Sequence, residues 1–211
     1  MSNLRLSGIA TFAVVFLACS TSSAQQPIEI TPIVSAFFGG SMSTYNGDVD
    51  LSDVTSYGGA LDYSLNREVA VELSYSYAKP NAKFTPYPNA GLGVQSFSTD
   101  VVNHYVQLGA RYTAGKGKFL PFLLIGGGVA IFSPTDQTTY STETRFAMSF
   151  GAGLKLALGE KVALRVQGRL LMPLYFSGGG FWFGTGGASV GVTAGVPILQ
   201  GDLGAGLTIT M

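Results

Sequence analysis

The sequence is poor in charged residues and in cysteine. It has 12 Lys and Arg and 12 Asp and Glu among 211 residues, so 11% of the chain is charged, against about 25% in typical soluble domains. This composition cannot supply the charged, patch-free surface that a soluble domain of this size needs. Zero net charge gives no footprint for nucleic acid, and a single cysteine excludes a disulfide framework or a zinc finger.

Apolar residues and glycine are abundant instead. The chain is 46% hydrophobic and 12% aromatic, contains 29 glycines and has a mean hydropathy of +0.33. This composition excludes intrinsic disorder, and the length is that of one domain. We therefore expect a membrane protein.

Residues 1–24 have the features of a signal peptide. A short apolar stretch, Ile9–Ala18, is followed by the small residues Ser22-Ser23-Ala24. The stretch is too short to span a bilayer, which takes about 20 residues. We expect cleavage after Ala24 and export of a single domain, residues 25–211. The alternative is a lipoprotein that is cut before Cys19 and lipidated there.

No segment after residue 24 is predicted to be a transmembrane helix. The apolar segment Phe119–Phe132 contains Pro121 and three consecutive glycines, and the uncharged segment Leu170–Gly201 is rich in glycine. In a helix, glycine costs about 1 kcal/mol and proline about 3 kcal/mol relative to alanine. A membrane span in this chain is therefore expected to be a β-strand.

Strict alternation of large apolar and small or polar residues supports this interpretation. It extends over Val69–Tyr77, Phe146–Leu158 and Val162–Met172, and a period of two predicts strands with two unlike faces. Eight strands are predicted, and short and long connections alternate between them, as in outer-membrane barrels. We predict an all-β, eight-stranded antiparallel up-and-down transmembrane β-barrel, with strands at 30–42, 56–65, 69–78, 101–113, 119–132, 145–158, 162–176 and 198–211 and long loops at 43–55, 79–100, 133–144 and 177–197.

Alternation alone does not say which face points inward, since a soluble lipocalin-like barrel also alternates. The polar face consists mainly of Gly, Ala and Ser. Such small residues suit a crowded lumen, and a water-exposed face would be rich in Lys and Glu. Aromatic residues also gather near strand ends, as interfacial girdles do: Phe37, Phe38, Tyr45, Tyr57, Tyr63, Tyr75, Tyr77, Tyr112, Phe119, Tyr175 and Phe176.

The chain resembles the outer-membrane β-barrel family that includes OmpA-like and OmpW-like proteins. The resemblance lies in Gly58–Leu65, Tyr105–Tyr112, Pro121–Gly128, Gly151–Lys155 and Gln200–Met211. It implies location in the outer membrane of a Gram-negative cell, contact with lipids and lipopolysaccharide, and insertion by the barrel-assembly machinery. Family members usually end in an aromatic residue, whereas this chain ends in Met211.

Parity places several charges inside the barrel. Pairing across two short turns sets Asp62 opposite Glu72, and Lys155 opposite Arg165. Like charges that face each other directly repel, so each pair needs partners elsewhere. The expected lumen network consists of Asp62, Glu72, Arg111, Lys155, Arg165, Arg169 and Asp202, with an acidic side facing a basic side.

This network predicts a barrel plugged by ion pairs, because the interior of eight strands is just wide enough for side chains to fill. A gated channel for small solutes or hydrophobic compounds is the alternative. His104, the only histidine, is the one ready general base near neutral pH, and Ser98 and Asp100 are near it in sequence. A barrel lipid hydrolase is therefore a third hypothesis, although parity turns His104 outward at the external rim.

We expect no catalytic, metal or cofactor site, and an envelope-structural or surface-interaction role without enzymatic activity. A surface contact, if present, is expected in the loops, which commonly carry function on a rigid scaffold. Phe181, Trp182 and Phe183 form an aromatic cluster among glycines in the loop at 177–197. They are predicted to bind a surface partner of unknown identity or to lie at the membrane interface.

Overall fold

The computed structural model of the chain describes residues 28–43, 47–88, 95–115, 117–135, 142–184, 187–195 and 198–211. The predicted signal peptide and Cys19 lie outside these described residues. None of the described residues belongs to a helix that could cross a membrane.

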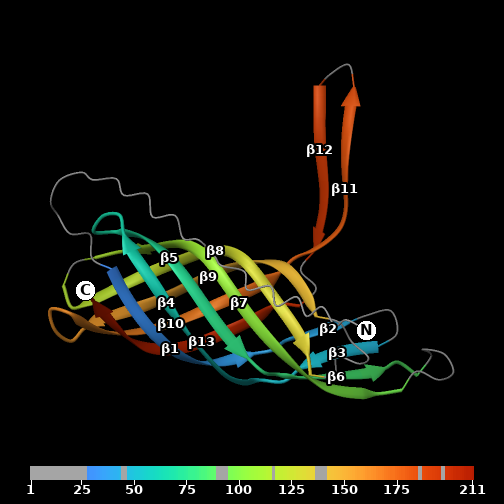
Figure 1. The fold of residues 1–211 in the computed structure, drawn as a ribbon, viewed down its shortest axis with the longest axis horizontal. Coiled ribbons are helices and arrows are strands. Elements are labelled where there is room, and N and C mark those ends of the chain that lie inside the picture. The colour runs from blue at the N-terminus through green and yellow to red at the C-terminus, as the bar shows by residue number, and fades with distance from the viewer. Residues whose placement is uncertain are drawn as a thin grey trace, which may run out of the picture.

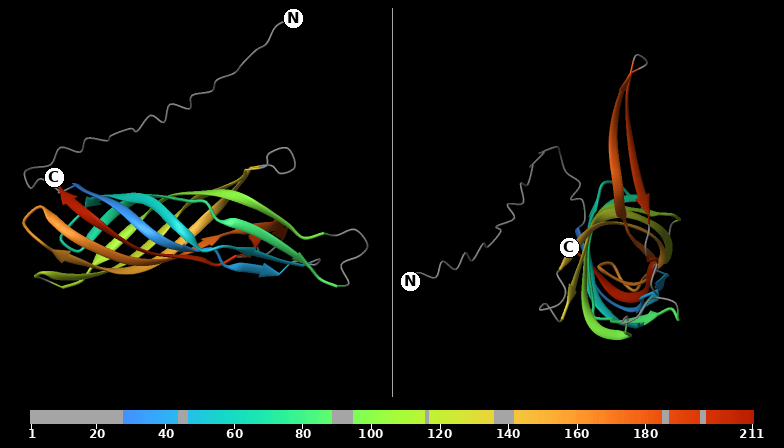
Figure 2. Two further views of the ribbon diagram at one scale, coloured as in Figure 1. Left: turned by 90° about the horizontal axis from the view of Figure 1, so that it is seen from below. Right: turned by 90° about the vertical axis from the view of Figure 1, so that its right-hand side faces the viewer.

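Eight antiparallel strands close into a barrel (Figures 1 and 2). Each strand pairs with the next around the ring, and the last pairs with the first. The prediction of eight strands is therefore confirmed. In chain order the barrel strands are β1 (Ile28–Phe38), β4 (Val54–Ser64), β5 (Val69–Ala78), β7 (Phe97–Thr113), β8 (Phe119–Pro134), β9 (Glu143–Ala157), β10 (Val162–Pro173) and β13 (Gln200–Thr210).

Short turns lie at one end of the barrel, as predicted. They follow β4, β7 and β9, and the backbone N–H of Met211 donates to the carbonyl of Ile28 at 2.9 Å at the same end. The turn between β4 and β5 is closed by Asn66, whose Oδ1 accepts from the backbone N–H groups of Glu68 and Val69 at 2.8 Å. Short turns of this kind fix the register of the strands that they join.

The long connections differ from the prediction, because three of the predicted loops contain strands. β2 (Ser41–Ser43), β3 (Gly47–Leu51) and β6 (Asn81–Pro86) add to the outer end of β7 and extend the barrel wall (Figure 1). β11 (Tyr175–Gly184) and β12 (Gly187–Gly195) form a separate hairpin. Pairing to a long neighbouring strand supplies backbone hydrogen bonds that composition alone does not reveal.

The first barrel strand is also shorter than predicted. It ends at Phe38 rather than continuing to residue 42, because Gly40 has φ of +75°. Glycine adopts this left-handed conformation without a steric penalty. The chain changes direction there and enters β2.

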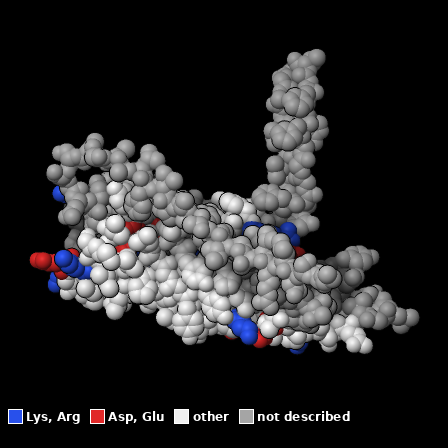
Figure 3. Space-filling model, viewed as in Figure 1, with Lys and Arg blue, Asp and Glu red and all other residues white. Residues whose placement is uncertain are grey.

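The two faces of the wall agree with the predicted polarity. Outward side chains on the barrel strands are large and apolar, for example Leu61, Leu108 and Leu170, which are half exposed. Figure 3 shows a broad uncharged band on one side of the barrel, with Lys, Arg, Asp and Glu mostly toward its ends. Inward positions include Thr31, Ser35, Ser56, Ala60 and Ala70, all buried. Small residues therefore do fill much of the lumen.

Aromatic residues on the outer wall lie near both ends of the barrel strands, for example Tyr63 and Tyr57 on β4, which are about half exposed. On β7, Tyr112 lies near the short-turn end, and His104 lies eight positions away toward the other end. At about 3.3 Å per residue and a tilt of about 40°, this separation is roughly 20 Å along the barrel axis. The prediction is wrong for one girdle residue. Phe37 is fully buried in the lumen, because it belongs to the inward face of β1. Tyr45 lies outside the described residues.

Candidate functional site

The most charged part of the structure is an ionic cluster inside the lumen near the short-turn end. Its six members are largely shielded from solvent. Three carboxylates face three cations, so the cluster has no net charge. The ionic cluster consists of Glu29, Asp62, Glu72, Arg111, Lys155 and Arg165.

Arg165 is the centre of this cluster. Its Nη2 lies 2.7 Å from Oε2 of Glu72, its Nη1 lies 3.1 Å from Oδ2 of Asp62, and its side chain is 1% exposed. Nε donates to Oε1 of Gln167 at 2.7 Å, and the guanidinium lies 4.9 Å from the ring centre of Phe122. Every nitrogen of a buried guanidinium thus has a partner, as a stable buried charge requires.

The register of the neighbouring strands agrees with the prediction. Asp62 pairs with Glu72 between β4 and β5, and Lys155 pairs with Arg165 between β9 and β10. The structure also brings Arg111 to Asp62, with Nε 3.0 Å from Oδ1. Repulsion within each like-charged pair is therefore offset by opposite charges within hydrogen-bond distance.

Glu29 was missed by the sequence analysis. It binds Arg111 at 2.7 Å and Lys155 at 2.6 Å, so it neutralises two cations. The signal was present in the parity of β1, because residue 29 shares the inward face of Thr31 and Ile33. The predicted strand began one residue too late to include it.

Arg169 corrects another part of the predicted network. It was expected to face Asp62 and Glu72, but it pairs with Asp202 on the neighbouring strand. Nε and Nη2 of Arg169 lie 3.1 and 2.5 Å from the two carboxylate oxygens. This bidentate geometry is a strong form of ion pair, and it separates Arg169 from the ionic cluster.

A cluster of mainly apolar side chains lies in the lumen beyond this pair. Tyr105 lies at their centre, donates from its hydroxyl to Oε1 of Gln200, and meets Phe132 edge-on with ring centres 6.1 Å apart. We name this group the apolar collar: Phe37, Ala78, Tyr105, Ala130, Ala147 and Leu171. Its members are at most 2% exposed.

The inward residues of β10 give the order of these layers. From the short-turn end, Arg165 of the ionic cluster comes first, then Gln167, then Arg169, and then Leu171 of the collar. All four are buried. The lumen is therefore occupied in sequence by charged, amide, charged and apolar side chains.

His104 lies on the outer wall, as its parity predicts. Nδ1 lies 2.9 Å from the hydroxyl of Tyr75, and the ring lies 5.4 Å from that of Tyr77. The hydroxyl of Ser98 donates to Asn81, and Asp100 binds Lys79 at 3.1 Å. The structure thus pairs His104 with a tyrosine and gives Ser98 and Asp100 other partners.

Two further expectations concern the loops and metals. Phe181, Trp182 and Phe183 are in β11, but their side chains lie outside what the structure describes. Within the described part of the chain, no group of three or more His, Cys, Asp or Glu residues could hold a metal ion.

Asp48, in β3 of the outer extension, has a shifted pKa. The hydroxyl of Tyr87 donates to Oδ1 of Asp48 at 2.7 Å. This hydrogen bond stabilises the ionised carboxylate, and it lowers the pKa of Asp48 below its ordinary value.

Comparison with known proteins agrees with this architecture. The family model described as "Outer membrane protein beta-barrel domain" matches residues 11–194. No curated protein matches the chain.

Several solved structures share the fold. OprG from Pseudomonas aeruginosa has 13% identity and a TM-score of 0.61, with 88% of this chain and 96% of that chain covered. Neisserial surface protein A has 16% identity and a TM-score of 0.57, with 90% and 100% covered. The outer membrane protease OmpT from Escherichia coli has 9% identity and a TM-score of 0.51, with 90% and 99% covered. At these identities the likeness shows the fold alone.

Proposed function

The chain belongs to the outer-membrane protein β-barrel family, and from that premise we propose that it is a non-conducting barrel with a structural or surface-interaction role in the envelope. Its location is the outer membrane. The outward face of the barrel is apolar over its middle, so we propose that it contacts membrane lipids and lipopolysaccharide. Insertion by the barrel-assembly machinery is part of the same proposal.

One observation supports the proposal that the lumen is closed. The side chain of Arg165 is 1% exposed and binds Asp62 and Glu72 at the same time. A hydrated ion that passes this level has to separate these charges, and breaking a buried ion pair costs about 3–5 kcal/mol. The apolar collar adds a second barrier, since five of its six side chains have no polar atom and the hydroxyl of Tyr105 is bound to Gln200. Two successive barriers of different chemistry support a plug rather than a filter.

The surface role is assigned to the outer end of the barrel. There β2, β3 and β6 extend the wall beyond the eight-stranded ring, and β11 and β12 form the separate hairpin (Figure 1). One row across the extension is apolar, with Met42 opposite Val49, Val49 opposite Phe84, and Phe84 opposite Phe97. Phe181, Trp182 and Phe183 of β11 remain the candidate contact residues on the hairpin.

Planar-bilayer recording of the purified protein tests the closed lumen. We expect no stepwise conductance from the wild type at voltages at which open, water-filled porins conduct. Repeated, uniform steps would favour the alternative, a small-solute channel.

Attachment assays with Phe181→Ala, Trp182→Ala and Phe183→Ala test the surface role. Loss of binding to cells or surface glycans supports it, and unchanged binding by the triple variant removes these residues from it.

Absence of enzymatic activity is also part of the proposal. OmpT is named a protease, so a barrel of this shape can carry catalysis. The partners of His104 here are Tyr75 and Tyr77, and neither is the nucleophile of a hydrolase. We expect no turnover of phospholipid or lipid A by the wild type. Turnover that is lost in His104→Ala would contradict this expectation.

A further inference from the structure

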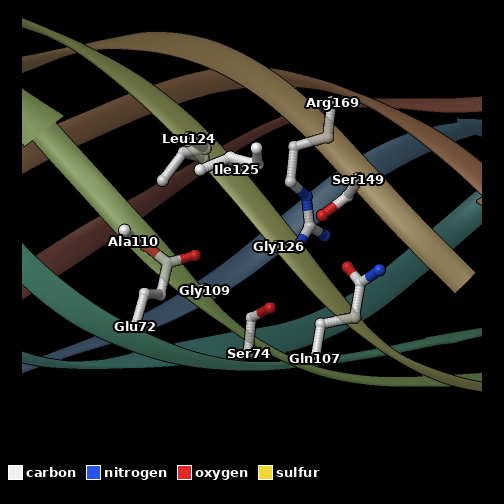
Figure 4. A pocket seen from close by; sticks show the side chains of 10 residues that line it. All are labelled: Glu72, Ser74, Gln107, Gly109, Ala110, Leu124, Ile125, Gly126, Ser149 and Arg169. Carbon is white, nitrogen blue, oxygen red and sulfur yellow. The ribbon is translucent and has the colours of Figure 1, made fainter. Parts of the chain in front are cut away.

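A small cavity lies in the lumen between the ionic cluster and the apolar collar. Its volume is about 10 Å³, which is about the space that one water molecule needs. Figure 4 shows the side chains of Glu72, Ser74 and Gln107 pointing into it from one side, and those of Ser149 and Arg169 from the other. Five polar side chains thus converge on a space with room for a very small ligand.

Gln107 is the residue that most needs this ligand. It is 3% exposed, and neither Oε1 nor Nε2 of its amide has a hydrogen-bond partner among the described residues. A buried amide without partners destabilises a fold, and buried polar groups are normally satisfied by protein or by ordered water. The side-chain amide of Gln107 therefore needs a partner that can both donate and accept a hydrogen bond.

The two charged residues that line the cavity each have an ion-pair partner elsewhere in the lumen. Arg165 binds Oε2 of Glu72, and the side chain of Glu72 also lines the cavity. Asp202 binds Nε and Nη2 of Arg169, whose side chain lines the cavity from the opposite side. One negative and one positive group, each already neutralised, line the same space.

We propose that this cavity is a binding site for one ordered water molecule, held by Gln107, Ser74 and Ser149 between Glu72 and Arg169. A neutral ligand fits because the charges of the lining cancel. Water can donate to the carboxylate and to Oε1 of Gln107 while it accepts from Nε2 of Gln107 or from the guanidinium, and buried waters make about three such bonds. Chloride can only accept hydrogen bonds, and a bare cation can only take acceptors.

The bound water would join two parts of the lumen that protein contacts leave separate. The ionic cluster ends at Glu72, and the next ion pair is Arg169 with Asp202. A water between Glu72 and Arg169 makes one continuous hydrogen-bonded network from the short-turn end to the apolar collar. The inference goes beyond the proposed function and does not depend on it, since conductance and water binding are measured separately.

Gly126 offers a direct way to displace this water. A methyl group at this position would come 2.9 Å from Oγ of Ser149, with the next atoms at 3.6 Å or more, so it enters the cavity. Gly168→Ala is the matched control, because its methyl group on the outer wall meets its nearest atoms at an ordinary 3.8 Å. Both substitutions add one methyl group to a barrel strand.

The experiment uses the refolded full barrel in nanodiscs. In the wild type and in Gly168→Ala, we expect nuclear Overhauser contacts between a long-lived water and the Gln107 side-chain amide. In Gly126→Ala this contact is lost, and the unfolding midpoint falls by roughly 2–4 °C below that of Gly168→Ala. In a Gln107→Met background the effect of Gly126→Ala shrinks, because no amide is left without its water.

Three results overturn the proposal. The first is a wild-type Gln107 amide without any water contact, which decides the matter even if Gly126→Ala fails to fold. The second is a Gly126→Ala protein at least as stable as Gly168→Ala, which means that the cavity is dry and is simply filled. The third is an anomalous-scattering peak in the cavity of crystals soaked in bromide or rubidium, which means that an ion occupies it.

Discussion

Arg165 and Glu72 join opposite walls of the barrel, with Nη2 of the arginine 2.7 Å from Oε2 of the glutamate. β10 and β5 are separated by β4, β1 and β13 in one direction around the ring and by β7, β8 and β9 in the other. The two side chains therefore meet across the full width of the lumen. A contact of this kind ties together strands that share no backbone hydrogen bond.

Removal of one partner from this pair is expected to destabilise the barrel. Glu72→Gln leaves Arg165 with an uncompensated share of its buried charge, and the expected loss in free energy of unfolding is about 3–5 kcal/mol. Ser76→Ala is the control, because Ser76 lies on the same strand and face and has no ion pair. Urea unfolding in lipid vesicles measures both. A Glu72→Gln barrel as stable as the wild type would show that these charges are hydrated.

Glu29→Gln tests the residue that the sequence analysis missed. This change leaves Lys155 and Arg111 without one carboxylate that both use. We expect a loss of about 3 kcal/mol or more in the free energy of unfolding, as for a broken buried pair. Glu160→Gln removes an exposed carboxylate in the turn before β10 and is expected to change stability by less than about 0.5 kcal/mol. Equal effects of the two substitutions would contradict the assignment.

Conductance should depend on both barriers of the lumen. Arg165→Ala removes the centre of the ionic cluster but leaves Tyr105 in the collar, so we expect at most brief, small openings in planar bilayers. Arg165→Ala combined with Tyr105→Ala is expected to give sustained conductance. Arg145→Ala removes an ion pair with Glu143 near the surface, and this variant is expected to show no conductance. A double variant that folds but does not conduct would mean that other residues close the lumen.

The pKa of Asp48 should depend on Tyr87. The hydrogen bond from Tyr87 lowers this pKa, so the folded value lies below that of the unfolded chain. Ionised Asp48 therefore stabilises the outer sheet above the unfolded-state pKa, and this contribution is lost as the pH falls through the folded-state pKa. In Tyr87→Phe we expect the pKa to rise toward its ordinary value in an NMR titration of the carboxyl carbon. Tyr57→Phe should leave it unchanged, and an unshifted Asp48 in Tyr87→Phe would refute the contact.

Local sequence features determined the strands and their faces. Alternation with period two identified the inward residues Asp62, Glu72, Lys155 and Arg165, because successive side chains on a strand point to opposite sides. Two short turns then set Asp62 opposite Glu72 and Lys155 opposite Arg165, since a tight turn leaves little choice of register. Strand parity also turned His104 outward. Each of these inferences needs only residues that are close in sequence.

The partners of the inward charges were decided only by closure of the barrel. Which residues meet across the lumen depends on the stagger that accumulates around eight strands, and no local pattern contains it. Glu29 therefore binds Lys155 from a distant part of the chain. Arg169 pairs with Asp202 rather than with the ionic cluster, because the register of β10 and β13 places the two residues side by side. The extra strands beyond the ring form for a similar reason, because a long neighbour such as β7 supplies the backbone partners. The sequence by itself determined which side chains enter the lumen, and the tertiary structure decided which of them touch.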